Sequence, residues 1–166
     1  LERSLDRLTM IKPPDLANHF HAEHLSCVLE SYYQFIGNHL IQPDADHVKM
    51  AQKANDAPFF IASHGLEADP ILNYGNLYAL KLFAMSWETF TQPPSRYTAE
   101  EPNRAERNRL LTSVRQQGYI EDYSGIRISS RGERFMIHRA TVWNVFDPTG
   151  ARIGQAATFS DWEPVP

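Results

Sequence analysis

Three histidines near the N-terminus are the first residues whose types and spacing could do chemistry. His19, His21 and His24 lie close to Glu23 and Cys27, and all five side chains are of kinds that bind zinc. On a helix, His21 and His24 share a face, but His19 points about 140° away from His24. Because two helical histidines without a fixed third ligand do not make a zinc site, we interpret them as solvent-facing residues and predict no metal.

Acid–base chemistry is the second candidate. His64 stands beside Gly65 and could act as a general base, with Asp69 or Asp122 as its acid partner. Nothing in their spacing brings these side chains together, and the chain has no nucleophile motif centred on a serine or a cysteine. A small acid–base enzyme is therefore the alternative hypothesis.

The elements that must position such residues are clearest in the last third of the chain. Three runs rich in β-formers, Tyr119–Ser129, Arg134–Phe146 and Ala151–Trp162, are joined by short polar segments that contain Gly132 and Gly150. This pattern predicts an antiparallel meander of three strands. The middle run is apolar on both faces, which is typical of a central strand covered on both sides.

Side-chain alternation predicts which residues of the outer two strands face the covering helices. In the first strand, Ile120, Ile126 and Ile128 share one parity, and in the third Ile153, Ala157 and Phe159 share another. Two shorter strands are expected before the meander, at 59–62 and 70–74.

Helices are expected to supply the cover. The longest is predicted from Asp15, as its N-cap, to about Leu40, before Gln42-Pro43; residues 25–40 carry its apolar stripe. Further helices are predicted at 46–53, at 77–84 and from a Ser86 cap to residue 90.

A last helix is expected from Asn103 to Gln117, with Glu106 completing a capping box and Gly118 at its C-terminus. The side of this helix that carries its arginines is expected to be solvated (Arg104, Arg107, Arg109 and Arg115).

Composition excludes several classes of function. The chain has 166 residues and a formal net charge of −4 without a basic run, so we predict no nucleic-acid partner. No apolar stretch approaches the roughly 20 residues of a membrane helix, and the first seven residues lack the plan of a secretory signal. Cys27 is the only cysteine, which favours a cytoplasmic protein.

The order of two strands, helices and three antiparallel strands is that of a PAS domain. More specifically, the chain resembles the bacterial MEKHLA family, which is PAS-like and also occurs at the C-terminus of plant class-III homeodomain–leucine-zipper factors. The matching segments are Ser63–Gly65, Asp69–Asn76, Pro94–Arg96, Asn103–Arg104, Tyr123–Ser129, Ala140–Asn144 and Gly154–Phe159. The resemblance implies an α+β fold: a PAS-like antiparallel sheet at 58–163 with helices across one face, preceded by an N-terminal helical extension at 1–57.

In PAS-like folds the functional cavity lies between the sheet and its helices. The polar residues that this comparison places around it are the candidate ligand-binding residues: Asn73, Asn76, Arg96, Tyr123, Arg127, Trp143, Asn144 and Gln155. Gln155 shares parity with Ala157 and is expected to point inward. Asn76 as a helix cap, Asn73 as a turn amide and Arg127 as an outward-facing charge are the competing structural interpretations.

The resemblance also allows a check of whether this chain has the residues that the known cofactors of PAS domains need. Covalent flavin photochemistry needs a cysteine in the middle of the domain, but Cys27 lies in the N-terminal extension. Haem needs an axial histidine, and residues 103–129 contain none, while His138 on the middle strand is a poor substitute. A non-covalent flavin or another small organic ligand stays open.

The leading hypothesis is a non-enzymatic sensory module that holds a small molecule and acts through protein–protein contacts. The apolar stripe of residues 25–40 would either form a homodimer or cover the second face of the sheet. A pure interaction domain with a filled interior is a third hypothesis.

Overall fold

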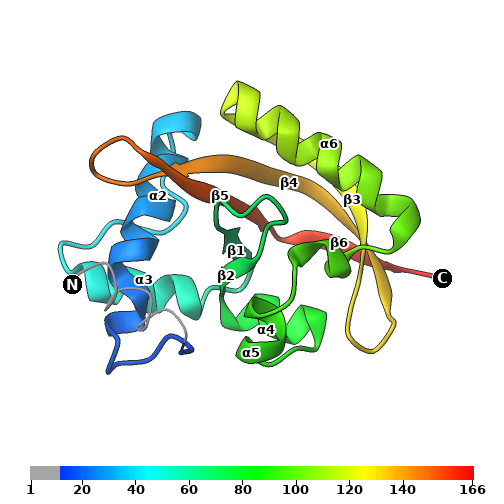
Figure 1. Ribbon diagram of the computed structural model, residues 1–166. Helices are drawn as coiled ribbons and strands as arrows, with labels where there is room; N and C mark the ends of the chain where they lie inside the picture. Colours follow the sequence, from blue (N-terminus) through cyan, green and yellow to red (C-terminus); the bar gives the residue numbers. More distant parts are fainter. Residues whose placement is uncertain (1–11) are drawn as a thin grey trace.

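The computed structural model describes residues 12–166. The prediction made for residues 1–7 lies outside the described residues, as does the start of the extension expected at 1–57. The elements follow in this order: η1 (His19–His21), α2 (Ala22–Ile36), α3 (His47–Asn55), β1 (Phe60–His64), β2 (Leu72–Gly75), α4 (Leu77–Phe83), α5 (Trp87–Thr91), η2 (Ser95–Thr98), α6 (Glu101–Gln117), β3 (Tyr119–Ile128), β4 (Arg134–Phe146), β5 (Arg152–Phe159) and β6 (Asp161–Val165). Figure 1 shows α2 and α3 gathered at one end of the molecule and β6 at the other.

Within the described residues the strands form one antiparallel sheet in the order β2-β1-β5-β4-β3, with β6 also paired to β4. The predicted meander is therefore confirmed, except that its third run is split at Ser160. The halves, β5 and β6, pair with β4 on one side and in one register, from Asn144 opposite Gln155 to Arg134 opposite Val165. The long β4 thus holds both halves in line.

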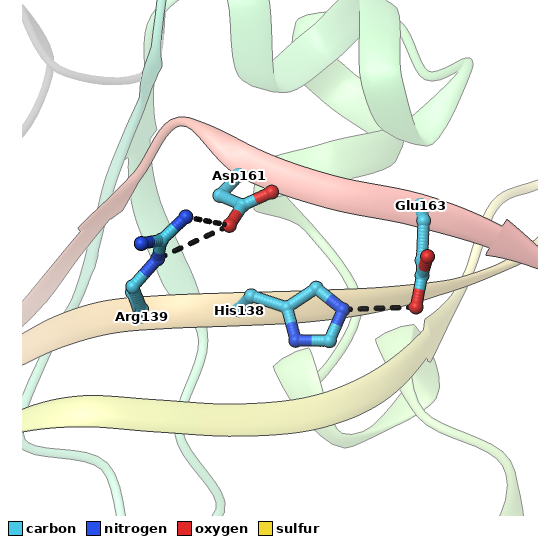
Figure 2. Close-up of polar contacts among 4 residues, drawn as sticks. All are labelled: His138, Arg139, Asp161 and Glu163. Atoms are coloured by element: carbon cyan, nitrogen blue, oxygen red, sulfur yellow. Dashed lines mark hydrogen bonds and ion pairs between the residues drawn. The ribbon is translucent and has the colours of Figure 1, made fainter.

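Polar pairs on the surface join β6 to β4 (Figure 2). Arg139 Nη2 lies 2.5 Å from Asp161 Oδ2, and His138 Nε2 lies 3.1 Å from Glu163 Oε1. Because these side chains are largely solvent-exposed, each pair contributes little to stability.

Irregularities in β3 and β4 change which side chains face the helices. β3 shifts register twice between Ile120 and Gly125, where Asp122 has a φ of 60°. As a result Gly125 and Arg127 are buried, and the prediction that Ile126 would face the helices is wrong; Ile128, of the same parity, points away with it.

A similar reversal occurs in β4 at Arg139, whose φ is 51°. Phe135 and Ile137 face the helices before it, whereas Ala140 and Val142 face them after it. Odd-numbered residues before Arg139 and even-numbered residues after it therefore face the same side of the sheet.

The inner face of the sheet, defined here as the face under α4, α5 and α6, carries most of the aromatic core. The helices begin largely as predicted: Asn76 Oδ1 accepts a hydrogen bond from Ala79 N, and Ser86 Oγ accepts one from Thr89 N. The buried members of this core are Phe60, Ala62, Ala79, Phe83, Phe90, Phe135, Ile137, Ala140 and Phe159.

The outer face is covered at one end by α2. Val28 of α2 packs with Trp143 and Val145 of β4, and the Trp143 indole N–H donates to the Val28 carbonyl over 3.1 Å. The apolar stripe of α2 is therefore buried against its own sheet. Ile153 joins this outer cluster, so its predicted inward orientation is wrong, whereas Ala157 and Phe159 face the helices as predicted.

The N-terminal helix is shorter than predicted. Residues 19–21 all have φ between 53° and 57°, which makes a left-handed turn that no right-handed helix can cross. Helix α2 therefore starts at Ala22, and it ends at Gly37 rather than near Leu40, because Gly37 adopts a φ of 83°. Asp15 does not cap it; its carboxylate instead accepts a hydrogen bond from Asn18 N.

Helix α6 starts earlier than predicted, at Glu101 with Pro102 in its first turn, so Asn103 lies inside the helix and is not its N-cap. Gly118 ends the helix with a φ of 99°, as predicted.

Candidate functional site

A cavity of about 100 Å³ lies between the inner face of the sheet and α4, α5 and α6. Much of its wall is apolar, with side chains from strands and helices alike (Phe60, Leu72, Phe83, Phe90, Leu110, Ile137, Val142 and Phe159). Its polar lining comes from η2, from α6 and from β1, β3 and β5. A mixed wall of this kind is typical of a small-molecule site.

Arg107 of α6 is the first polar residue of the cavity. It was expected on the solvated side of the helix, and this prediction is wrong, because only 5% of the residue is exposed. One of its terminal nitrogens, Nη2, donates to Ser95 Oγ, while Nη1 has no hydrogen-bond partner within residues 12–166. Burial, and then the nearby Arg127, lower the pKa of the Arg107 guanidinium to about 10, so it remains charged at neutral pH.

The sequence did contain a signal for this orientation. Arg107 precedes Leu110, Leu111 and Val114 by three, four and seven residues, which is the spacing of a single helix face. It therefore lies on the apolar stripe of α6.

Arg127 is the second buried guanidinium. The bulges in β3 turn it inward, where 8% of it is exposed, and its Nη2 donates to the Tyr123 hydroxyl over 3.2 Å. Its Nη1 donates to the Ile126 carbonyl over 2.9 Å. In the described part of the chain, neither Arg107 nor Arg127 has a carboxylate within 4 Å, so two positive charges face one cavity without a counter-charge.

Gln155 points inward, in agreement with its predicted orientation, and is 2% exposed. Its Nε2 donates both to the Leu111 carbonyl of α6, over 3.0 Å, and to Asn144 Oδ1, over 3.2 Å. Asn144 in turn donates to the Val114 carbonyl. The two amides thus anchor α6 to the sheet, and Gln155 Oε1 is left without a partner among the described residues.

His64, at the end of β1, also lines the cavity. Its Nδ1 lies 2.9 Å from the Gly65 carbonyl, which only accepts, so Nδ1 carries the proton and Nε2 is an acceptor. Nε2 is buried and has no partner among the described residues. Burial is the largest cause and lowers the pKa of His64, which keeps the ring neutral. The Gly65 carbonyl acts in the opposite direction, Arg107 lowers the pKa further, and the neighbouring Gln155 side chain raises it slightly.

The carboxylates considered as acid partners of His64 do not line this cavity. Asp69 is 45% exposed and lies 3.2 Å from Arg96, while Asp122 is exposed at the bulge of β3. The arrangement thus provides a neutral acceptor and two cations, but no acid–base pair.

The other predicted site residues lie elsewhere. Asn76 is fully buried as the cap of α4, and Asn73 accepts a hydrogen bond from Ser63 Oγ. Arg96 is exposed on the surface, and Trp143 packs on the outer face. Of the eight candidates, Tyr123, Arg127 and Gln155 line the cavity, and Asn144 hydrogen-bonds to Gln155.

Within residues 12–166 no three histidine, cysteine, aspartate or glutamate side chains come together as a metal site. The prediction that the three N-terminal histidines are all solvent-facing is wrong for two of them. His21 is buried, with Nε2 2.8 Å from the Lys12 carbonyl, and His24 Nε2 lies 2.8 Å from Ser63 Oγ. None of the helices in this part of the chain has the length and hydrophobicity needed to cross a membrane.

Solved structures with the same fold are PAS and light-oxygen-voltage domains. A PAS domain from Colwellia psychrerythraea is similar at 14% identity and a TM-score of 0.59, over 70% of this chain and 94% of that one. A light-oxygen-voltage domain studied with a flavin analogue has 10% identity and a TM-score of 0.56, over 71% and 85%. A blue-light activated histidine kinase from Erythrobacter litoralis has 17% identity and a TM-score of 0.53, over 65% and 34%.

The flavin that one of these neighbours suggests does not fit the residues present. A cavity of about 100 Å³ is smaller than the roughly 150 Å³ that holds one benzene, and a flavin has three fused rings. Cys27 packs with the outer cluster around Trp143, across the sheet from the cavity. His138, considered as a haem ligand, pairs with Glu163 on the surface (Figure 2).

The sequence itself was also compared with known families. No functionally curated protein matches it. The sequence model of the MEKHLA domain matches residues 22–164, which extend from the start of α2 into the last strand, β6. The chain therefore belongs to the MEKHLA domain family, with the fold of a PAS domain.

Proposed function

We propose that this protein is a sensory module that binds one small molecule in the cavity between its sheet and α4–α6. The observation that carries the proposal is the concentration of unsatisfied polar atoms around that cavity. Arg107 Nη1, Gln155 Oε1 and His64 Nε2 are buried and without partners among the described residues, and all three residues line it. Because buried polar groups in native proteins are nearly always hydrogen-bonded, a bound polar molecule is their natural partner.

The competing hypotheses have less support. A pure interaction domain with a filled interior has no need of buried charges at a cavity, since unpaired charges cost several kcal/mol when they are buried. An acid–base enzyme needs a proton donor near His64, and its predicted partners, Asp69 and Asp122, lie outside the cavity lining.

The structural effect of ligand binding would be transmitted to the surface of the protein through β4. Val142 faces the cavity, while the next residue, Trp143, faces outward and donates to Val28 of α2. A shift of β4 on ligand binding would therefore move the contact with α2, which makes α2 the proposed output element. If ligand binding moves the contact between β4 and α2, the rate of hydrogen exchange of the α2 amides should differ with and without a bound compound. An unchanged rate would speak against this coupling.

The test of the proposal is a thermal-shift screen of a library of metabolites of up to about six non-hydrogen atoms, accompanied by native mass spectrometry of the freshly purified chain. Ala157→Leu fills the cavity from β5, and Ala105→Leu makes the same change on the exposed side of α6. We expect at least one compound to raise the Tm of the wild type and of Ala105→Leu but not of Ala157→Leu. If every compound leaves the wild-type Tm unchanged, or acts equally on Ala157→Leu, the proposal fails.

A homodimer and a cytoplasmic location stay predictions. The stripe of α2 is buried within the chain, so two copies would have to meet through other residues of α2, such as Tyr33, which is 39% exposed. Sedimentation velocity of the wild type and of Tyr33→Glu checks this: a dimer formed through α2 becomes a monomer in the variant.

A further inference from the structure

The chemistry of the cavity specifies more than the presence of a ligand. Resting on the proposed function, we infer that the ligand is a 2-hydroxycarboxylate of three carbon atoms. Its carboxylate would lie against Arg107 and Arg127, and its hydroxyl would donate to His64 Nε2.

The charge of the site requires an anion. Arg107 is 5% exposed and Arg127 is 8% exposed. Among the described residues, no carboxylate forms an ion pair with either arginine. Two cations repel each other in a low-dielectric interior. An anion bound in the cavity beside both of them would stabilise them. Arg107 Nη1 is a buried donor that has no acceptor among the described residues.

The remaining unsatisfied atoms require a donor. Both protons of Gln155 Nε2 are used by the Leu111 carbonyl and Asn144 Oδ1, so its Oε1 is the acceptor that faces the cavity unpaired. His64 presents Nε2 as a second acceptor, because Nδ1 donates to Gly65. Its ring neighbours the Gln155 side chain, so the two acceptors lie at one place in the cavity wall. A carboxylate alone accepts only, so it cannot satisfy either atom; a hydroxyl on the same molecule can.

The size of the cavity limits the carbon chain. A volume of about 100 Å³ is less than that of the cavity known to hold a benzene of six carbon atoms, so a ligand of about six non-hydrogen atoms is the upper limit. Phe83, Phe90 and Phe159 leave the rest of the wall apolar, which suits a methyl group.

Isothermal titration with four matched probes tests the inference: lactate (as D and L isomers), propionate, lactamide and inorganic phosphate. Propionate lacks the hydroxyl, lactamide lacks the charge, and phosphate is an anion without an apolar tail. We expect one lactate isomer to bind at least about fivefold more tightly than propionate and at least about tenfold more tightly than lactamide or phosphate, from the ordinary strengths of neutral and charged hydrogen bonds.

Variants assign the two contacts separately. Arg107→Met removes the buried guanidinium, and Arg109→Met makes the same change on an exposed arginine of the same helix. The first should abolish lactate binding and leave the Tm of the free protein unchanged or higher, because an unpaired buried charge is lost; the second should change neither. His64→Phe should lower lactate affinity to that of propionate while leaving propionate affinity unchanged.

The outcomes separate this inference from the proposed function. If lactamide or phosphate binds as tightly as lactate, or if His64→Phe leaves lactate affinity unchanged or weakens lactate and propionate equally, the hydroxycarboxylate assignment is overturned. If no probe binds, but another compound protects the wild type and not Ala157→Leu, the assignment is likewise overturned and the proposed function stands. If nothing at all protects the wild type, both fail.

Discussion

Asn76 provides the sharpest test of the structure, because the chain uses every hydrogen-bonding group of its side chain. Oδ1 accepts from Ile61 N over 3.2 Å and from Ala79 N over 3.1 Å. Nδ2 donates to the Ala54 carbonyl over 3.0 Å and to the Phe59 carbonyl over 2.8 Å. The residue has no solvent exposure, and these four bonds join α3, β1 and α4.

Asn76→Ala should therefore cost far more than the loss of an ordinary helix cap. At about 1 kcal/mol net for each of four bonds, the free energy of unfolding should fall by about 4 kcal/mol, because buried backbone groups lose a partner that no water replaces. Ser86→Ala is the matched control: Ser86 caps α5 through one bond to Thr89 N and is exposed, so we expect a loss of about 1 kcal/mol.

Asn76→Asp separates the cap from the network. It keeps the shape and both acceptor bonds, but it places a carboxylate oxygen against the carbonyls of Ala54 and Phe59, so its loss should be at least as large as that of the alanine variant. Urea unfolding followed by far-UV circular dichroism measures all three variants. A loss below about 2 kcal/mol for Asn76→Ala, or one equal to that of Ser86→Ala, would refute the reasoning.

Three further predictions follow from other buried contacts. Burial, and then His21, lower the pKa of His24 from 6.5 to about 4, whereas the unfolded chain titrates near 6.5; the free energy of unfolding should therefore fall as the pH drops from about 6.5 to 4. The full shift corresponds to about 3 kcal/mol, and because the ring keeps some solvent exposure we expect about 2 kcal/mol; thermal melts across this range measure the slope, which His24→Gln should reduce. Trp143→Phe removes the buried indole N–H donor to α2 and should cost about 1–3 kcal/mol in urea unfolding; no change would mean that the bond is not formed. Gly154→Ala would place its Cβ 2.0 Å from the main-chain oxygen of His64 on the neighbouring strand, so the soluble yield should collapse, whereas Gly132→Ala, with a φ of 77° and open space around it, should cost only about 1–2 kcal/mol; equal yields would refute the clash.

Much of the fold could be predicted because its signals are local. Alternating apolar runs separated by Gly132 and Gly150 predicted the meander, and Asn76 and Ser86 predicted the starts of two helices. These features depend on a few neighbouring residues, so no knowledge of the rest of the molecule is needed. The inward orientation of Gln155 was predicted on the same basis.

The cavity depended on features that have no local signal. The sequence gives no reason for Asp122 and Arg139 to adopt a positive φ, yet these two residues decide which parity of β3 and β4 faces the helices. Arg127 is turned inward only by the first of these irregularities. Arg107 shares the apolar face of α6, but only the packing of that helix on the sheet decides that a cation is buried there. The sequence therefore determined which elements form and in which order, because backbone preferences are local; the tertiary structure alone decided which charges meet in the interior, because burial depends on segments far apart in the chain.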